Sequence, residues 1–262
     1  KVFGYIGGAV AHIYHSIDKY NEMEIINCIH EQGAGFAAEG YARVTGKSGV
    51  AFATSGPGAT NLITPIGSCF FDSVPTMFIT GQVNTYEYKY DKAVRQIGFQ
   101  ETDIVSIIKP IVKYAVMVDN IENIRYELEK AYYLSQEGRK GPVLVDIPMN
   151  IQRSEVDINS LNSFFDSNEY LEFEISTNEE DNIQKTVNLL NISKRPIILI
   201  GGGDRLSDAS EELLKYVEKY SIPVVYSLMG KDGISEDYKY NFGLIGSYGN
   251  RYGNLALANS DL

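Results

Sequence analysis

The sequence of 262 residues has few cysteines and no long apolar run. Its two cysteines, Cys28 and Cys69, lie far apart in apolar surroundings, which favours reduced core thiols over a disulfide scaffold. No stretch approaches the ~20 apolar residues that a membrane helix needs. The first residues also lack the cleavage pattern of a signal peptide. We therefore expect a cytoplasmic protein that does not cross a membrane.

Basic residues are absent from one stretch of the chain. Between Glu155 and Asp181, nine acidic residues occur without any Lys or Arg, so most of the net charge of −11 lies in this segment. The remainder is nearly balanced in charge, which argues against nucleic acid as the partner. Small anionic cofactors and substrates stay compatible with the sequence, because they respond to local fields rather than to net charge.

Several common site signatures are also missing. The sequence GGGDRL (201–206) does not complete a G-x-G-x-x-G dinucleotide motif, because Leu206 stands where the third glycine belongs. The turn SGPGATN (55–61) lacks the Lys-Ser/Thr of a phosphate loop. His12, His15 and His30 have no Cys or carboxylate at ligand spacing, so we expect no metal site within the chain. No local motif suggests a Ser-His-Asp triad.

Strand and helix patterns alternate along the first part of the chain. Apolar strands are expected at residues 2–5, 24–29, 49–54, 75–81, 113–118 and 141–148, with helices between most of them. Uncharged strands such as GVAFAT are typical of buried parallel sheets. The pattern predicts an α/β fold, an open parallel sheet with helices on both faces. The segment 82–99 is polar and aromatic and long enough to be a functional loop.

A change in composition marks a domain boundary. We predict a first domain at residues 1–150, an acidic surface linker at 151–181 and a second, Rossmann-like α/β domain at 182–262. The second domain repeats the alternation, with helices at 182–191 and 209–220 and strands at 196–200 and 222–226. The sequence stops at Leu262, where another strand is expected, so we interpret the chain as a fragment with a truncated second domain.

Glu31 and the glycine-rich turn at 55–61 follow two of the predicted strands. The carboxyl ends of parallel strands meet at one edge of the sheet, where open α/β sheets bind their ligands. Glu31 is either a catalytic acid or an acid at a helix start, stabilised by the helix dipole by a few tenths of a kcal/mol. The turn either presents free N–H groups to a polar ligand or is a plain strand-to-helix turn. The pattern alone slightly favours the helix-start interpretation of Glu31.

Six segments in order resemble the pyrimidine-binding domain of thiamine-diphosphate-dependent enzymes, and within them the acetolactate synthase (acetohydroxyacid synthase) family. The segments are VFGYIGGAVAHIY, HEQGAGFAAEGYARVTGKSGV, TSGPGATN, DSVPTMFITGQV, GFQETDIV and GPVLVDIP. The later stretch RPIILIGGGDRLSDASEELLKYVEKYSIPVVYSLMGKDGI resembles that family's central domain. The resemblance therefore covers nearly the whole chain.

The resemblance implies roles for seven residues. Glu31 would hydrogen-bond N1′ of the cofactor's aminopyrimidine and exchange a proton with it, which the activation of the cofactor requires. Gln100 would face the reacting centre. The other matching positions would form the cofactor site, with a loop at Tyr5, Gly7 and Gly8 and pyrimidine contacts from Pro57 and Asn61. The chemistry needs a carboxyl that can carry a proton, and no basic residue lies between His30 and Arg43.

The resemblance also implies partners outside the chain. Thiamine diphosphate would be the cofactor, and the Mg²⁺ that holds its diphosphate would be bound by a third domain absent from these residues. In this family that domain comes from a neighbouring subunit, so we expect a homodimer or homotetramer with active sites at the subunit interface. FAD is a further candidate cofactor, although Gly246–Gly249 replaces the stretch that lines the flavin in acetolactate synthases. The isolated chain is expected to be inactive.

Three functions follow as alternatives. The first is decarboxylation of a 2-oxo acid, with pyruvate as the expected substrate, and carboligation to acetolactate for branched-chain amino acid biosynthesis. The second is a related carboligase of surface-sugar or sulfoacetaldehyde type, supported by a longer loop at Tyr86–Ile97. In that loop Arg95 either binds a second anionic substrate or, as the sequence favours, is a solvated charge. The third is a flavin-binding or regulatory module, which would not need Glu31.

Overall fold

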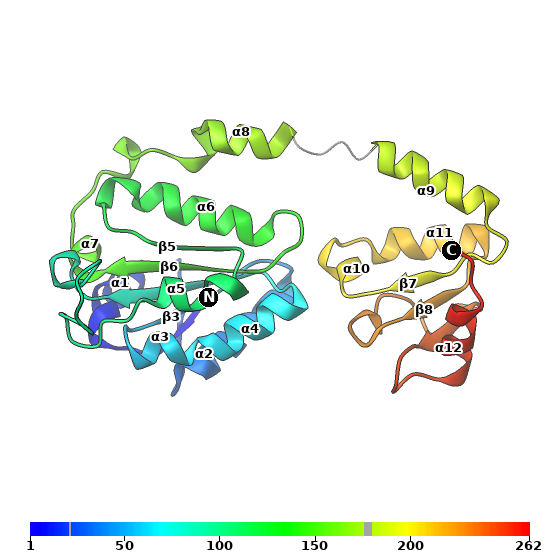
Figure 1. Cartoon of the computed structure of the whole chain (residues 1–262), viewed down its shortest axis with the longest axis horizontal. Helices are drawn as coiled ribbons and strands as arrows, with labels where there is room; N and C mark the ends of the chain where they lie inside the picture. The colour runs from blue at the N-terminus through cyan, green and yellow to red at the C-terminus, as the bar shows by residue number, and fades with distance from the viewer. Residues whose placement is uncertain (21, 176–179) are drawn as a thin grey trace. The chain divides into compact units, whose positions relative to one another are not determined.

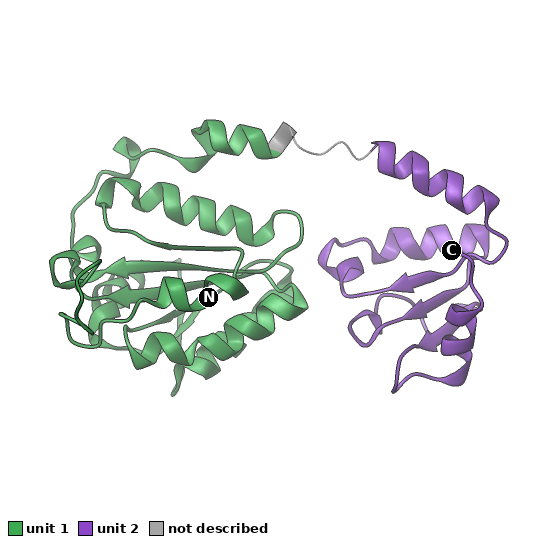
Figure 2. Cartoon of the chain, viewed as in Figure 1, with its two compact units in different colours: residues 1–175 green, residues 176–262 purple. Residues whose placement is uncertain are grey.

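The computed structural model describes residues 1–20, 22–175 and 180–262. The chain forms two compact units, Lys1–Ile175 and Ser176–Leu262, which Figure 2 shows in green and purple. Each unit has its own sheet and its own apolar core. None of the helices in the described ranges is long and apolar enough to cross a membrane.

Unit 1 is built on a six-stranded sheet in which all neighbouring strands are parallel. The strand order is β2-β1-β3-β4-β6-β5. The strands are β1 (Val2–Gly4), β2 (Ile25–Asn27), β3 (Gly49–Ala53), β4 (Thr76–Gln82), β5 (Tyr114–Met117) and β6 (Pro142–Pro148). The parallel sheet predicted from the alternating pattern is confirmed, and the central strands β3, β4 and β6 are almost entirely buried, as their apolar composition requires.

Helices cover both faces of this sheet, as expected. On one face lie α2 (Glu31–Thr45), α4 (Ile63–Asp72) and α5 (Ile104–Ile108), and on the other lie α1 (Ala11–Lys19) and α6 (Ile124–Gln136), with α6 and α2 on opposite sides in Figure 1. Neighbouring residues of β3 serve the two faces. Ala51 packs beneath α2, whereas Phe52 packs with α1, because side chains alternate along a strand.

The small residues of α2 allow the helix to approach the sheet closely. Ala34, Ala38 and Ala42, four residues apart, are fully buried on one stripe. At the sheet, a Cβ on Gly49 would come within 1.9 Å of the Ala38 carbonyl oxygen, so a larger residue at either position would push α2 away. The turn before α2 thus has a fixed position relative to β3.

The predicted acidic linker differs from the structure over residues 151–175. This stretch belongs to unit 1 and contains α7 (Met149–Gln152), two short 3-10 turns and α8 (Asn168–Ile175). Phe164 is fully buried against Tyr126 and Tyr133 of α6, and Lys130 pairs with Glu169. Aromatic side chains hold the segment although it lacks helical periodicity. Part of the predicted linker, residues 176–179, lies outside the described ranges.

Unit 2 is a smaller α/β unit, as the sequence predicts. Its three parallel strands are β7 (Ile198–Ile200), β8 (Val224–Tyr226) and β9 (Asn241–Leu244). Its helices are α9 (Glu180–Ile192), α10 (Gly203–Leu206), α11 (Ser210–Tyr220) and α12 (Arg251–Ala258). Ile200, Val217 and Val224 form the centre of its core. The backbone N–H of Ile197 donates to the carbonyl of Leu262, the last residue, beside the start of β7.

Candidate functional site

The loops that follow β1, β2 and β3 meet at one edge of the unit 1 sheet. Because β1 lies between β2 and β3, the carboxyl ends of these three parallel strands are adjacent. The loop after β2 leads into α2 at Glu31, where the His30 side chain accepts a hydrogen bond from the Gln32 N–H. The loop after β3 leads into α3 (Pro57–Asn61). The topology therefore brings together segments that are 30 residues apart in the sequence.

Glu31 lies at the centre of this edge. Its side chain is 8% exposed, and its Oε2 accepts a hydrogen bond of 3.0 Å from the Asn61 side-chain amide. Within the described residues no Lys, Arg or His forms an ion pair with this carboxylate, and none donates a hydrogen bond to Oε1. The predicted helix start is correct, but burial distinguishes Glu31 from an ordinary solvated acid at a helix N-terminus.

The glycine-rich turn packs directly against the carboxylate. A Cβ placed on Gly58 would lie 3.2 Å from Glu31 Oε1 and 2.7 Å from Thr54 Cγ2, so only a glycine fits at this position. Gly56 has φ +63°, a left-handed conformation that favours glycine. The two positions of SGPG thus require glycine for different reasons. Gly58 allows the close approach to Glu31, and Gly56 adopts the left-handed backbone conformation.

The loop after β1 closes the site from a second side. A Cβ on Gly7 would lie 2.4 Å from Thr54 Cβ, so this loop contacts the end of β3. The backbone N–H of Ala9 donates to Thr54 Oγ1 at 3.1 Å, which fixes the loop there. Gly8 is exposed, with nothing within 4 Å of a Cβ placed on it. Thr54, which the sequence reasoning did not single out, therefore joins the Gly7 loop to the Gly58 turn.

Gln100 reaches the same edge from a later part of the chain. Its Cβ lies 2.7 Å from the position that a Cβ on Gly56 would take. Its own backbone has φ +60°, which is uncommon for a residue other than glycine and marks a constrained position. The structure thus brings Glu31, Gly7, Asn61 and Gln100 to one edge of the sheet. Tyr5 and Pro57 are exposed near this edge, and no hydrogen bond joins either of them to Glu31 among the described residues.

Asp146 is a buried acid that the sequence reasoning passed over. It lies in β6 and is 1% exposed, and its carboxylate accepts hydrogen bonds from the Thr80 hydroxyl at 2.7 Å and the Gln82 amide at 2.9 Å. Burial raises the pKa of Asp146 to about 7, although these two hydrogen bonds act in the opposite direction. The available signal was an acid inside the apolar strand sequence GPVLVDIP.

The other titratable groups of the described residues include no candidate metal centre. Among the described residues, no group of three His, Cys, Asp or Glu side chains is placed to hold a metal ion. Cys28 and Cys69 are free thiols, and burial raises the pKa of Cys69 to about 12, so this thiol is unreactive near neutral pH.

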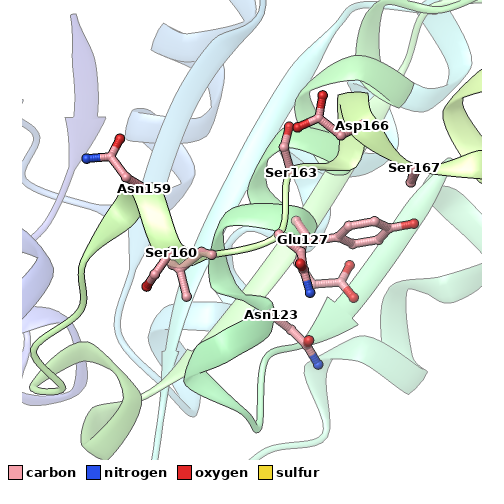
Figure 3. Close-up of a pocket in the computed structure, with 10 residues that line it drawn as sticks. Asn123, Glu127, Asn159, Ser160, Ser163, Asp166 and Ser167 are labelled. Carbon is pink, nitrogen blue, oxygen red and sulfur yellow. The ribbon is translucent and has the colours of Figure 1, made fainter.

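Unit 1 has a polar cleft of about 710 Å³ away from these residues. Figure 3 shows the side chains around it, which come from Asn123 just before α6, from α6 with Glu127, and from the 159–167 segment with Asp166. The cleft lies where the segment after β6 crosses α6. None of the site residues predicted from the sequence lines it, so its size does not make it the functional site.

Comparisons with known proteins match both units. Residues 1–107 match the family model described as thiamine pyrophosphate enzyme, N-terminal TPP binding domain, and residues 183–262 match the model of the central domain. The acetolactate synthase large subunit of Lactococcus lactis is 39% identical over 263 residues, covering 99% of this chain and 44% of the relative. The acetolactate synthase large subunit of Corynebacterium glutamicum is 41% identical, and the match covers 100% of this chain and 40% of the relative. The chloroplastic acetolactate synthase of Arabidopsis thaliana is 38% identical, and the match covers 100% of this chain and 38% of the relative.

The chain thus spans less than half the length of these relatives. The two matched domains follow one another in the same order as the two compact units. The edge that carries Glu31 lies within the first matched domain, the one described as binding thiamine pyrophosphate. With its N-terminal and central domains both matched, the chain belongs to the family of thiamine pyrophosphate enzymes.

Proposed function

We propose that the full-length protein decarboxylates a 2-oxo acid, pyruvate in the first instance, and ligates the product to a second 2-oxo acid to form an acetolactate. The observation that carries this proposal is the buried Glu31 carboxylate, which faces a glycine turn at the sheet edge and has no cationic partner among the described residues. The named relatives are acetolactate synthases, so the specialised carboligase and the non-catalytic module are not favoured.

The residues at the edge fit the aminopyrimidine of thiamine diphosphate. Glu31 Oε1 takes no hydrogen bond from the described residues, so it is open to a ring nitrogen that carries or accepts a proton. Because Gly58 has no side chain, the turn packs against this oxygen without covering it with a further group. When bound, thiamine diphosphate supplies the carbon nucleophile and the electron sink that loss of CO₂ requires.

Each of the seven site residues named from the sequence has a proposed role. Glu31 shares a proton with N1′ of the pyrimidine, and Asn61 holds the carboxylate in place through its hydrogen bond. Gln100, which packs against the Gly56 turn from a different loop, is assigned to the reacting centre. The remaining contacts to the cofactor are assigned to Tyr5, Gly7, Gly8 and Pro57.

The other half of the site is proposed to lie outside the chain. The diphosphate and its Mg²⁺ need carboxylate and carbonyl ligands, and we assign these to a further domain of a neighbouring subunit in a homodimer or homotetramer. Large apolar side chains exposed near the site support an interface there, namely Ile29, Phe36 and Phe99. FAD in unit 2 is proposed from the family resemblance alone, and the free thiols support a cytoplasmic location.

The test uses Glu31→Gln in the full-length protein. Exchange of the C2 proton of bound thiamine diphosphate, followed by NMR in D₂O, should slow by at least ~100-fold, within the range that general acid–base catalysis contributes. Glu122→Gln, an exposed acid on unit 1, is the matched control and should exchange at the wild-type rate. Normal exchange in Glu31→Gln with the cofactor bound would contradict the assigned role.

A second test concerns the length of the chain. Residues 1–262 alone should not consume pyruvate when thiamine diphosphate and Mg²⁺ are supplied, because half of the proposed site is missing. The full-length protein should do so under the same conditions, with product identification by mass spectrometry across a panel of 2-oxo acids. Turnover by the isolated residues would contradict the shared-site proposal.

A further inference from the structure

Glu101 is a buried acid in the loop that leads from β4 to α5. Its side chain is 8% exposed, yet within the described residues it has no cationic partner. Instead it accepts hydrogen bonds from three backbone N–H groups of its own loop. The Lys89 N–H donates to Oε1 at 2.9 Å, and those of Ile97 and Gly98 donate to Oε2 at 2.7 and 3.3 Å.

These bonds tie both ends of the exposed part of the loop to one carboxylate. Lys89 lies at its beginning and Ile97 at its end, and the residues between them are mostly exposed. Hydrogen bonds to an ionised acceptor are roughly twice as strong as those between neutral groups. Glu101 therefore holds the 89–98 stretch in a closed loop, together with the backbone bond of 2.9 Å from the Gly98 N–H to the Glu87 carbonyl.

Glu101 also directly follows Gln100, whose backbone is constrained. A residue other than glycine keeps a left-handed conformation only where its neighbours hold it. On one side Gly98 packs so closely on Val83 that a Cβ there would lie 2.7 Å from Val83 Cγ1. On the other side the Thr102 carbonyl accepts a 2.8 Å hydrogen bond from the Gln82 side chain. Glu101 lies in the chain between the Gly98 contact and the Thr102 hydrogen bond. Its carboxylate links this short stretch to Lys89 and Ile97 of the loop.

We propose that Glu101 is a positioning residue that holds Gln100 against the Gly56 turn at the edge of the site. The inference rests on the proposed function, because it assumes that Gln100 serves the reacting centre. Glu101 itself does not touch substrate or cofactor. It acts by keeping the loop closed, so that Gln100 has one backbone conformation when substrate binds.

The test combines Glu101→Gln with Gln100→Ala in the full-length protein. Glutamine keeps the shape of the side chain, but its NH₂ group cannot accept a hydrogen bond from a backbone N–H. At least one of the three hydrogen bonds to residue 101 is therefore lost. We expect kcat/KM for the 2-oxo acid to fall at least tenfold in Glu101→Gln. If Glu101 acts through Gln100, the double variant is no slower than Gln100→Ala alone, because residues that act as a unit are not additive.

Two further readouts separate positioning from a general loss of structure. Exchange of the cofactor C2 proton depends on Glu31, so it should stay within about twofold of wild type in Glu101→Gln. Trypsin should cleave Glu101→Gln faster than wild type after Lys92 or Arg95, both exposed in the loop. If Glu101→Gln does not fold, Glu101→Asp, which is one methylene shorter and cannot reach all three donors, replaces it.

Each outcome decides the proposal. Wild-type kcat/KM in Glu101→Gln, or defects that multiply in the double variant, would overturn it, as would unchanged trypsin cleavage. Loss of C2 exchange together with turnover would show a structural role only and would also overturn it. A full-length wild-type protein without 2-oxo acid turnover would instead refute the proposed function, and the trypsin comparison would then still decide whether Glu101 holds the loop.

Discussion

Replacing Asp146 with asparagine should flatten the pH dependence of unfolding between pH 5 and 8. The wild-type carboxyl is buried in β6 between Thr80 and Gln82, and no cation pairs with it among the described residues. Burial raises its pKa from 3.8 to about 7, because the charged form loses its hydration. Asparagine can keep the bond from the Thr80 hydroxyl and never carries a charge.

The sign and size follow from proton linkage. Between pH 4 and 7 the folded protein holds a proton on Asp146 that the unfolded chain has released, so stability decreases as pH rises. The contribution is complete below the unfolded pKa and is lost as pH passes through the folded pKa. At about 1.36 kcal/mol per pH unit, a pKa raised from 3.8 to about 7 corresponds to at most about 4 kcal/mol over this range.

Urea unfolding followed by circular dichroism at pH 5, 6, 7 and 8 measures this effect in the wild type and in Asp146→Asn. The wild type should lose stability relative to the variant as pH rises, and most of the loss should fall below pH 8. Asp91→Asn, the same change at an exposed position, should run parallel to the wild type. A constant difference between Asp146→Asn and wild type across the four pH values would refute the reasoning, because asparagine's altered contact with Gln82 gives only a pH-independent offset.

Two further changes test the packing around the site and the linker. Gly56→Ala should cost about 1–3 kcal/mol of stability, measured by urea unfolding, since φ is +63° and the new Cβ meets Gln100; Gly40→Ala, with open space in α2, should be neutral or stabilising, and equal effects would contradict the assigned strain. Phe164→Ala should cost about 3–5 kcal/mol because the ring is fully buried. The control is Phe165→Ala, which should cost less because Phe165 is 43% exposed. A cost under about 1 kcal/mol for Phe164→Ala would mean that residues 151–175 do not pack on α6.

The alternation of elements was readable from the sequence because it depends on local spacing. Strands such as GVAFAT appear as short uncharged runs, and helices such as 121–136 carry a period of 3.6 residues, both within a short window. The acid at the start of α2 and the SGPG turn are likewise recognised from their immediate neighbours in the sequence. The family segments added the roles proposed for Glu31 and Gln100, which spacing alone left open.

Contacts between distant segments depended on the tertiary structure. The strand order, with β1 between β2 and β3, brings Asn61 to Glu31 across 30 residues, and no local pattern encodes that order. The packing of residues 151–175 was missed because irregularly spaced aromatic side chains hold it, with Phe164 at the centre.

The sequence by itself determined the α/β class, the two-part organisation and the position of Glu31 at a helix start. Only the tertiary structure decided that this acid is buried without a cationic partner among the described residues, that Asp146 accepts hydrogen bonds from β4, and that Glu101 accepts hydrogen bonds from three N–H groups of its loop. The physical reason is that burial and hydrogen-bond partners come from segments far apart in the chain, whereas helix and strand periods come from neighbours.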